Sequence, residues 1–397
     1  MQKNPIYLDH GATTPLHPEV LAAMTPYWQE QFGNPSSHHR TGYLAARAVR
    51  EARESVADLL GTEPDAVVFT GCGSESNNLA LRGTMQAARA AGRGNHFITT
   101  AIEHSAVLET ARQLRDHYGF DLTILPVDGE GCLDPAGVAA AIRPDTVLIS
   151  VMAANNEIGT IQPWAEIGAL AREHGILYHS DAVQLIAYRR WNLAADPVDM
   201  LTIAPHKFYG PKGVGILIVR PGVELVPALT GGGHENGLRA GTLNVPLIVG
   251  AAAALRLAMA EQEERLAHVL PLRDRLLEGV MAAVSGVIVT GHPTARLPHH
   301  ASFAFRNVSG NDLLMHLDMA GIAASSGSAC SSGDPKPSAV LEALDLSPEW
   351  TKGGLRLTLG RQNTNADVDS LLHELPNIVT SLTAVETGFA AALGHSR

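Results

Sequence analysis

Short apolar runs and longer amphipathic segments alternate along the first part of the chain. Between residues 66 and 219 the apolar runs have the length of β-strands, and the segments between them have apolar residues at helical spacing. Strands that alternate with helices form a mostly parallel sheet with helices on both faces. The pattern therefore predicts an α/β fold whose main sheet lies in this region.

The regions on either side of the sheet are more helical. Apolar residues recur at helical spacing from Tyr43 to Leu60, and Gly61 is suited to end that helix. Helical composition returns between 249 and about 283, where Pro271 predicts an interruption. The strand-like runs VIVTG, SFAFRNV and GLRLTLG and three helical segments then predict a smaller α+β unit. We expect a large domain over 15–258 and a small domain formed by 1–14 and 259–397.

Composition restricts the class of protein. The 397 residues are 45% hydrophobic and 17% charged, which is ordinary for a globular protein. The formal net charge is −11 and no basic run occurs, which argues against nucleic-acid binding as the main task. The sequence has neither a signal-peptide core nor an apolar run suited to span a membrane, so we expect a cytoplasmic protein.

Cysteine and histidine give no sign of a metal centre. The cysteines stand at positions 72, 132 and 330, without CxxC spacing, and the 18 histidines include no HExxH motif. We therefore expect no structural metal site. Cys72 is expected to pack in the interior. Cys330 lies among small residues near two prolines, and this composition leaves a structural thiol and a reactive thiol both open.

Two apolar runs end in groups that suit one organic cofactor. The run GILYHSD ends in Asp181, and VDMLTIA is followed by Pro205, His206 and Lys207. Pyridoxal phosphate (PLP) needs an anion beside its pyridinium nitrogen and an amine for its aldehyde. Taken alone, Asp181 is more often expected to cap a helix, and Lys207 is more often expected to lie on the surface. A lysine in a proline-flanked turn after a buried strand is less ordinary.

Two other strand ends carry weaker signals. A glycine-rich turn leads into a helix at Gly73 and Ser74, where free backbone N–H groups would bind a phosphate. His104 follows the next apolar run, at the end of a strand where ligands of parallel sheets bind. Such turns and such histidines are commonly structural, so neither signal decides the function.

The segments SDAVQ and HKFYGPKGVG resemble the cofactor signature of fold type I PLP enzymes, in the cysteine desulfurase branch of the class V aminotransferase family. The resemblance covers nearly the whole chain. It implies a fold type I PLP-dependent transferase with a mostly parallel large domain, a smaller α+β domain and PLP as cofactor. It also implies that the following residues contact the cofactor: Gly73, Ser74, His104, Asn156, Asp181, Gln184, His206, Lys207 and, from the partner subunit of a homodimer, Thr242.

The same resemblance implies the reaction. Arg356 and Asn156 would bind L-cysteine, and Lys207 would remove its Cα proton while Asp181 holds the cofactor ring. The thiolate of Cys330, in SSGSAC, would take the substrate sulfur as a persulfide, leave L-alanine, and pass sulfur to an acceptor or scaffold protein in iron–sulfur or thio-cofactor biogenesis. His104 would help to generate the thiolate or protonate an intermediate.

Three other functions are alternatives to a cysteine desulfurase, and the sequence departs from the family pattern in three places. A selenocysteine lyase remains an alternative; an aminotransferase would not need Cys330, and a non-catalytic scaffold would not need Lys207. Ala204 replaces a phosphate-binding hydroxyl, a loss of roughly 1.5–3 kcal/mol, and Pro205 stiffens the approach to the lysine. His10 and Gly11 stand where the family has Asn-Ala, in a loop expected to face the substrate.

Overall fold

The computed structural model describes residues 5–326 and 337–394. A seven-stranded sheet forms its centre, with the order β2-β8-β7-β6-β5-β3-β4. Strands β7, β6, β5, β3 and β4 are parallel, whereas β8 runs antiparallel to both of its neighbours. The predicted mostly parallel sheet is confirmed. Its strands are β2 (Val67–Thr70), β3 (His96–Thr100), β4 (Asp121–Leu125), β5 (Thr146–Ser150), β6 (Leu177–Asp181), β7 (Met200–Ile203) and β8 (Gly215–Val219).

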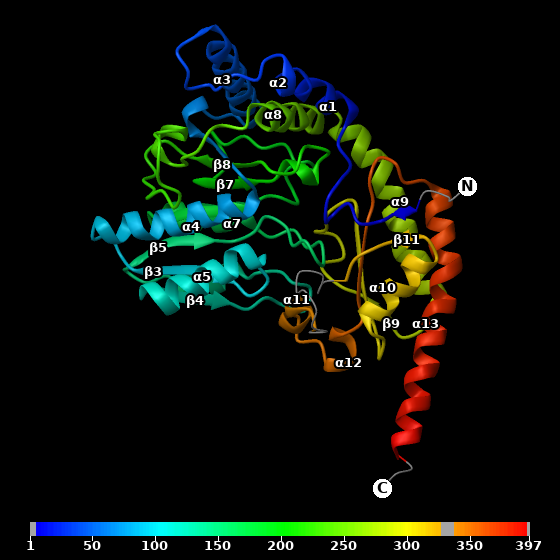
Figure 1. The fold of residues 1–397 in the computed structure, drawn as a ribbon. Coiled ribbons are helices and arrows are strands. Elements are labelled where there is room, and N and C mark those ends of the chain that lie inside the picture. Colours follow the sequence, from blue (N-terminus) through cyan, green and yellow to red (C-terminus); the bar gives the residue numbers. More distant parts are fainter. Residues whose placement is uncertain (1–4, 327–336, 395–397) are drawn as a thin grey trace.

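Alternate side chains of each strand enter different cores. Ile216 and Ile218 of β8 pack in the larger core, whereas Leu217 packs on the opposite face of the sheet. Figure 1 shows the helices on both sides of these strands. One face is covered by α4 (Gly73–Ala90) and α5 (Ser105–Tyr118), and the other by α1 (Pro18–Met24), α2 (Pro26–Gln29), α3 (Arg40–Leu60), α6 (Pro135–Ala141), α7 (Trp164–Glu173) and α8 (Val245–Ala260).

A second core lies in the smaller unit, on the right of Figure 1. Its strands form a three-stranded antiparallel sheet and a parallel pair, in which the N-terminal β1 joins β11. This arrangement is consistent with the predicted domain boundaries, which stay a prediction. The elements are β1 (Ile6–Tyr7), α9 (Gln262–Ala283), β9 (Val287–Val289), β10 (His300–Phe305), α10 (Gly310–Met319), β11 (Ile322–Ala323), α11 (Ala339–Ala343), α12 (Pro348–Thr351), β12 (Gly354–Thr358) and α13 (Asn365–Gly394).

The helix boundaries confirm one expectation and correct another. Helix α3 ends at Leu60, and Gly61 follows in the left-handed conformation (φ 65°), as its position predicted. The predicted interruption at Pro271 is wrong, because α9 continues through it. A proline removes only one hydrogen bond of the ladder, and packing of α9 against α13 and β10 retains the helix. The chain bends instead at Glu261, between α8 and α9.

Helices α8 and α9 follow one another with only Glu261 between them. Within the described ranges no single helix is long and apolar enough to cross a membrane. The two helices meet that criterion only when combined, and they bend by 69° where they join.

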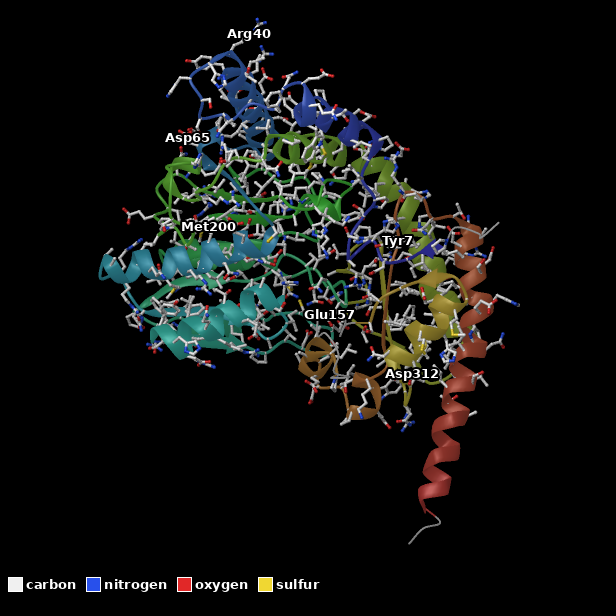
Figure 2. All side chains as sticks on the ribbon, in the orientation of Figure 1. Tyr7, Arg40, Asp65, Glu157, Met200 and Asp312 are labelled. Atoms are coloured by element: carbon white, nitrogen blue, oxygen red, sulfur yellow. The ribbon has the colours of Figure 1, made fainter. Side chains whose placement is uncertain are left out.

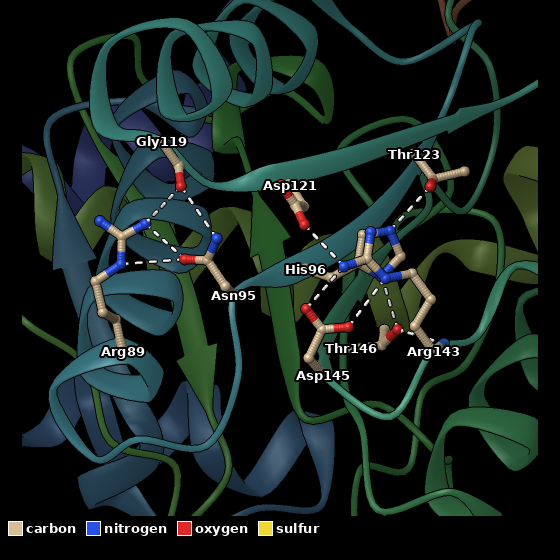
Figure 3. A network of polar contacts seen from close by, with 9 residues as sticks. All are labelled: Arg89, Asn95, His96, Gly119, Asp121, Thr123, Arg143, Asp145 and Thr146. Atoms are coloured by element: carbon tan, nitrogen blue, oxygen red, sulfur yellow. Dashed lines mark hydrogen bonds and ion pairs between the residues drawn. The ribbon is translucent and has the colours of Figure 1, made fainter.

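Polar side chains tie together the amino ends of three neighbouring strands (Figure 3). His96, at the start of β3, is buried and shares hydrogen bonds with the hydroxyl groups of Thr146 (2.7 Å) and Thr123 (2.9 Å). Arg143 lies beside them and pairs with Asp121 and Asp145. Burial lowers the pKa of His96, so its ring is neutral at neutral pH. These contacts occupy the amino ends of the strands. Ligands of parallel sheets bind at the opposite edge, where the strands have their carboxyl ends.

Candidate active site

A pocket of about 350 Å³ lies at the carboxyl edge of the large sheet. Because β3, β5, β6 and β7 are parallel, the residues that follow them meet at this edge. The start of α4 and the smaller unit complete the wall. The site residues named from the sequence that line this pocket are Gly73, Ser74, His104, Asn156, Asp181, Gln184, His206, Lys207 and Arg356.

Asp181 ends β6 and is buried under the pocket. Its Oδ2 accepts a hydrogen bond from Asn77 Nδ2 (2.7 Å), and its Oδ1 accepts one from the amide of Val183 (3.0 Å). Asn77 was missed in the sequence, although it lies one helical turn after Gly73 and therefore on the same face of α4. These two donors fix the orientation of the carboxylate.

Lys207 ends a 3₁₀ turn, Pro205–Lys207, that begins two residues after the end of β7. Its Nζ donates hydrogen bonds to the carbonyl oxygens of Gly11 and Ala12, both at 2.7 Å. The turn is compact because Gly210 approaches Pro205 so closely that a Cβ at position 210 would lie 2.6 Å from the proline ring. The amine is therefore held against the N-terminal segment of the chain.

Two histidines in the pocket have defined ring environments. His104 precedes α5, and its Nδ1 accepts a hydrogen bond from the amide of Ala106 (3.0 Å). In a neutral ring the proton is then on Nε2, the nitrogen left for the pocket. The Nδ1 of His206 lies 3.2 Å from the hydroxyl of Thr13. Burial, with the charges of Lys207 and Lys212, lowers the pKa of His206 to about 4.

The N-terminal loop only partly meets the expectation that it faces the substrate. Gly11 lines the pocket, and Gln184 Nε2 donates to its carbonyl at 3.0 Å. His10 instead turns away and is buried edge-on against Tyr7, with ring centroids 4.9 Å apart. Its ring fills a space beside Gly360, where a Cβ would lie 2.3 Å from it. Burial lowers the pKa of His10 to about 4.

Cys72 also differs from its predicted environment. It is exposed and lines the pocket, because it is the N-cap of α4 and its side chain lies at the open end of the helix. The expectation that it packs in the interior is wrong. Cys330 lies outside the described residues. Thr242 lines a separate cavity of about 190 Å³, together with Thr70, Gly71 and Arg239.

The sequence did not single out two carboxyl groups near the pocket, the half-buried Glu157 and the buried Glu103. Glu157 Oε2 accepts a hydrogen bond from Ser338 (2.6 Å), and Figure 2 shows it at the centre of the molecule, between the two units. Burial raises its pKa to about 7, against the opposing charge of Arg356. Glu103 Oε1 accepts a hydrogen bond from Met152 N (2.8 Å), while its buried Oε2 has no hydrogen-bond partner in the described part of the chain. No group of three or more metal-ligating side chains is found in the part of the chain described.

Glu103 is expected to make stability depend on pH. Burial raises its pKa to about 8, so the folded state binds its proton more tightly than the unfolded state. The stability associated with this group is complete below its unfolded pKa and is lost as the pH rises toward about 8. Glu103→Gln imitates the neutral form, so its stability relative to wild type should increase between about pH 5 and about pH 8, by roughly 3 kcal/mol.

Urea denaturation of both proteins at the two pH values measures this difference, with the exposed Glu63 changed to Gln as the control. If the difference in free energy of unfolding between Glu103→Gln and wild type is the same at both pH values, the assignment of a neutral carboxyl group is contradicted.

The chain is similar to known proteins of one family. The family model for aminotransferase class-V matches residues 6–371. A cysteine desulfurase IscS of Dictyoglomus turgidum is 44% identical over 96% of both chains, and one of Methanosarcina thermophila is 47% identical over 95% of this chain and 92% of its own. A solved NifS-like protein is 37% identical, with a TM-score of 0.88 over 95% of this chain and all of its own. The chain belongs to the aminotransferase class-V family, within its cysteine desulfurase branch.

Proposed function

We propose that this protein is a PLP-dependent cysteine desulfurase, which converts L-cysteine to L-alanine and transfers the sulfur to one of its own cysteines. One observation carries the proposal. The carboxylate of Asp181, the amine of Lys207 and the guanidinium of Arg356 come from distant parts of the sequence and line a single pocket. These groups match a pyridinium nitrogen, an aldehyde and a substrate carboxylate.

The donor set of the pocket fits PLP, which when bound supplies an acceptor for the electrons of a substrate carbanion. Asp181, held by Asn77, would pair with the ring nitrogen, and Lys207 would anchor the aldehyde. Gly73 begins α4 without a side chain, so backbone N–H groups there and at Ser74 are available to a phosphate. The other contacts proposed are His104 against the ring, Asn156 and Gln184 near the phenolic oxygen, and His206 beside Lys207.

The local packing is consistent with a small side chain without a hydroxyl group at position 204. A Cβ at position 73 would lie only 3.3 Å from the Cβ of Ala204, so the two small residues share a narrow space. We propose that Ser74 and the α4 amides bind most of the phosphate charge on this side.

The protein's own residues would move the protons and the sulfur. Arg356 binds the substrate carboxylate, and Lys207 removes the proton from Cα. Because Nδ1 of His104 accepts from a backbone amide, its Nε2–H suits a hydrogen-bond donor. This favours a role of His104 toward an intermediate over a role as the base that generates a thiolate.

We propose that Cys330 takes the sulfur. The described residues on either side of it in the sequence support this: Ser326 lines the pocket, and Ser338 donates a hydrogen bond to Glu157, next to Asn156. The C–S bond of cysteine breaks, an S–S bond forms on Cys330, and the substrate carbon gains a proton. These changes balance without an external oxidant. The persulfide would pass to an acceptor or scaffold protein in iron–sulfur cluster or thio-cofactor assembly.

The proposal is tested by supplying PLP and L-cysteine under reducing conditions. We expect sulfide and L-alanine in equal amounts. Release of selenide from selenocysteine without sulfide from cysteine would favour a selenocysteine lyase, and formation of a keto acid would favour an aminotransferase.

We also propose that the enzyme is a homodimer whose sites are shared. Thr242 lies outside the main pocket, which is consistent with a contact to the partner's cofactor phosphate. Exposed large apolar side chains gather between residues 21 and 44, as expected of a surface that a second copy covers. They are Leu21, Trp28, Phe32, Tyr43 and Leu44.

Sedimentation is expected to give a dimer, and mixed dimers of Lys207→Ala with Thr242→Ala test the shared site. If Thr242 acts across the interface, one site carries both changes and the other carries neither, so about half of the sites keep the wild-type affinity for PLP. Mixed dimers without any wild-type site would show that Thr242 serves its own subunit, and an active monomer would refute the dimer.

A further inference from the structure

The substrate-binding arginine is already paired with a carboxylate of the protein. Arg356 lies in β12 and is 6% exposed. Its Nη2 donates to Asp9 Oδ1 at 2.8 Å, and its Nη1 donates to the carbonyl of Asn156 at 3.0 Å. Asp9 follows β1 and lines the same pocket. One end of the guanidinium is therefore shared between an acid and a backbone carbonyl before any substrate enters.

Asp9 is better placed than Glu157 to act on this arginine. Glu157 is near enough to interact with Arg356 electrostatically, but its carboxyl group binds Ser338. Asp9 makes the direct ion pair, and its side chain is 18% exposed, so water screens the pair only partly. Arg356 Nε is buried beside Gly11 and has no hydrogen-bond partner among the described residues. The guanidinium thus keeps N–H groups for a second acceptor while its charge is largely balanced by Asp9.

We propose that Asp9 is a specificity-determining residue that shares the Arg356 guanidinium with the substrate carboxylate and thereby weakens the binding of that carboxylate. The inference rests on the proposed function of Arg356. A carboxylate that binds to the Asp9–Arg356 pair meets a nearly neutral pair instead of an isolated cation, and it is repelled by the Asp9 charge a few ångströms away. The product L-alanine carries an α-carboxylate, as the substrate does. An aspartate at position 9 would therefore also help the product to leave the site.

The variant Asp9→Asn separates charge from geometry. The asparagine Oδ1 still accepts from Arg356 Nη2, but the negative charge is gone. We expect L-alanine to bind the PLP-loaded variant about tenfold more tightly than wild type, since a like charge at this distance is removed from a poorly solvated site. The KM for L-cysteine should fall in the same direction. Asp9→Ala should show a smaller increase in affinity for L-alanine than Asp9→Asn, because Arg356 also loses the acceptor that orients it.

The experiment titrates PLP-loaded wild type and both variants with L-alanine and with ethylamine, which is alanine without its carboxylate, by calorimetry. Thermal melting establishes that each variant is folded. Tighter binding of L-alanine to Asp9→Asn with unchanged binding of ethylamine supports the inference. Equal or weaker binding of L-alanine, or the same gain for ethylamine, overturns it. If Asp9→Asn, which lacks the opposing charge, also binds L-alanine no better than ethylamine, the assignment of Arg356 to the carboxylate fails as well.

Discussion

Replacing Lys207 with alanine is expected to abolish turnover and the covalent attachment of PLP together. Lys207 stands four residues after the end of β7, and it lines the pocket with Asp181. The same amine would anchor the cofactor and move the Cα proton, so a single substitution removes both functions. We expect the rate of sulfide release to fall by at least about a thousandfold.

The measurement combines the visible absorption of PLP-reconstituted protein, borohydride reduction to fix any covalent link, and peptide mass spectrometry to locate it. Lys212→Ala is a matched control, because Lys212 stands five residues later and is exposed. We expect Lys212→Ala to retain covalently bound cofactor. A cofactor still linked to Lys207→Ala, at another lysine, would show that the wrong residue has been assigned.

Changing Cys330 to serine is expected to separate cofactor binding from sulfur transfer. The hydroxyl of serine is a far weaker nucleophile toward sulfur than a thiolate. The variant should therefore bind PLP and L-cysteine as wild type does, yet release sulfide at a rate lower by roughly a hundredfold or more. Sulfide and L-alanine release, with mass spectrometry for a sulfur adduct on each cysteine, provides the measurement.

The other two cysteines are controls for different environments. Cys132 is partly buried, and burial raises its pKa, so its thiol is a poor nucleophile. Cys72 is exposed within the pocket and therefore controls for a second thiol near the substrate. We expect Cys72→Ser and Cys132→Ser to remain active. Full activity in Cys330→Ser would mean that sulfur leaves without this thiol, as in a lyase that eliminates sulfur or selenium directly.

Local sequence determined much of this structure. Apolar runs of strand length, each followed by a helix, predicted the parallel sheet, because both patterns depend on neighbouring residues. In a parallel sheet the residues after successive strands meet at one edge. The sequence alone could therefore bring His104, Asp181 and Lys207 to a single site, and a glycine after Leu60 could end α3.

The contacts around these residues were decided by tertiary structure. Asp9 and Arg356 are 347 residues apart, and nothing near either one predicts that they pair. His10 turned from the pocket because Gly360, in a distant segment, leaves a space for its ring. Cys72 is exposed because it lies at the N-terminus of α4. Helix α9 continues through Pro271 because other elements pack against it. Each outcome depends on which surfaces meet after folding, and local patterns carry no information about that.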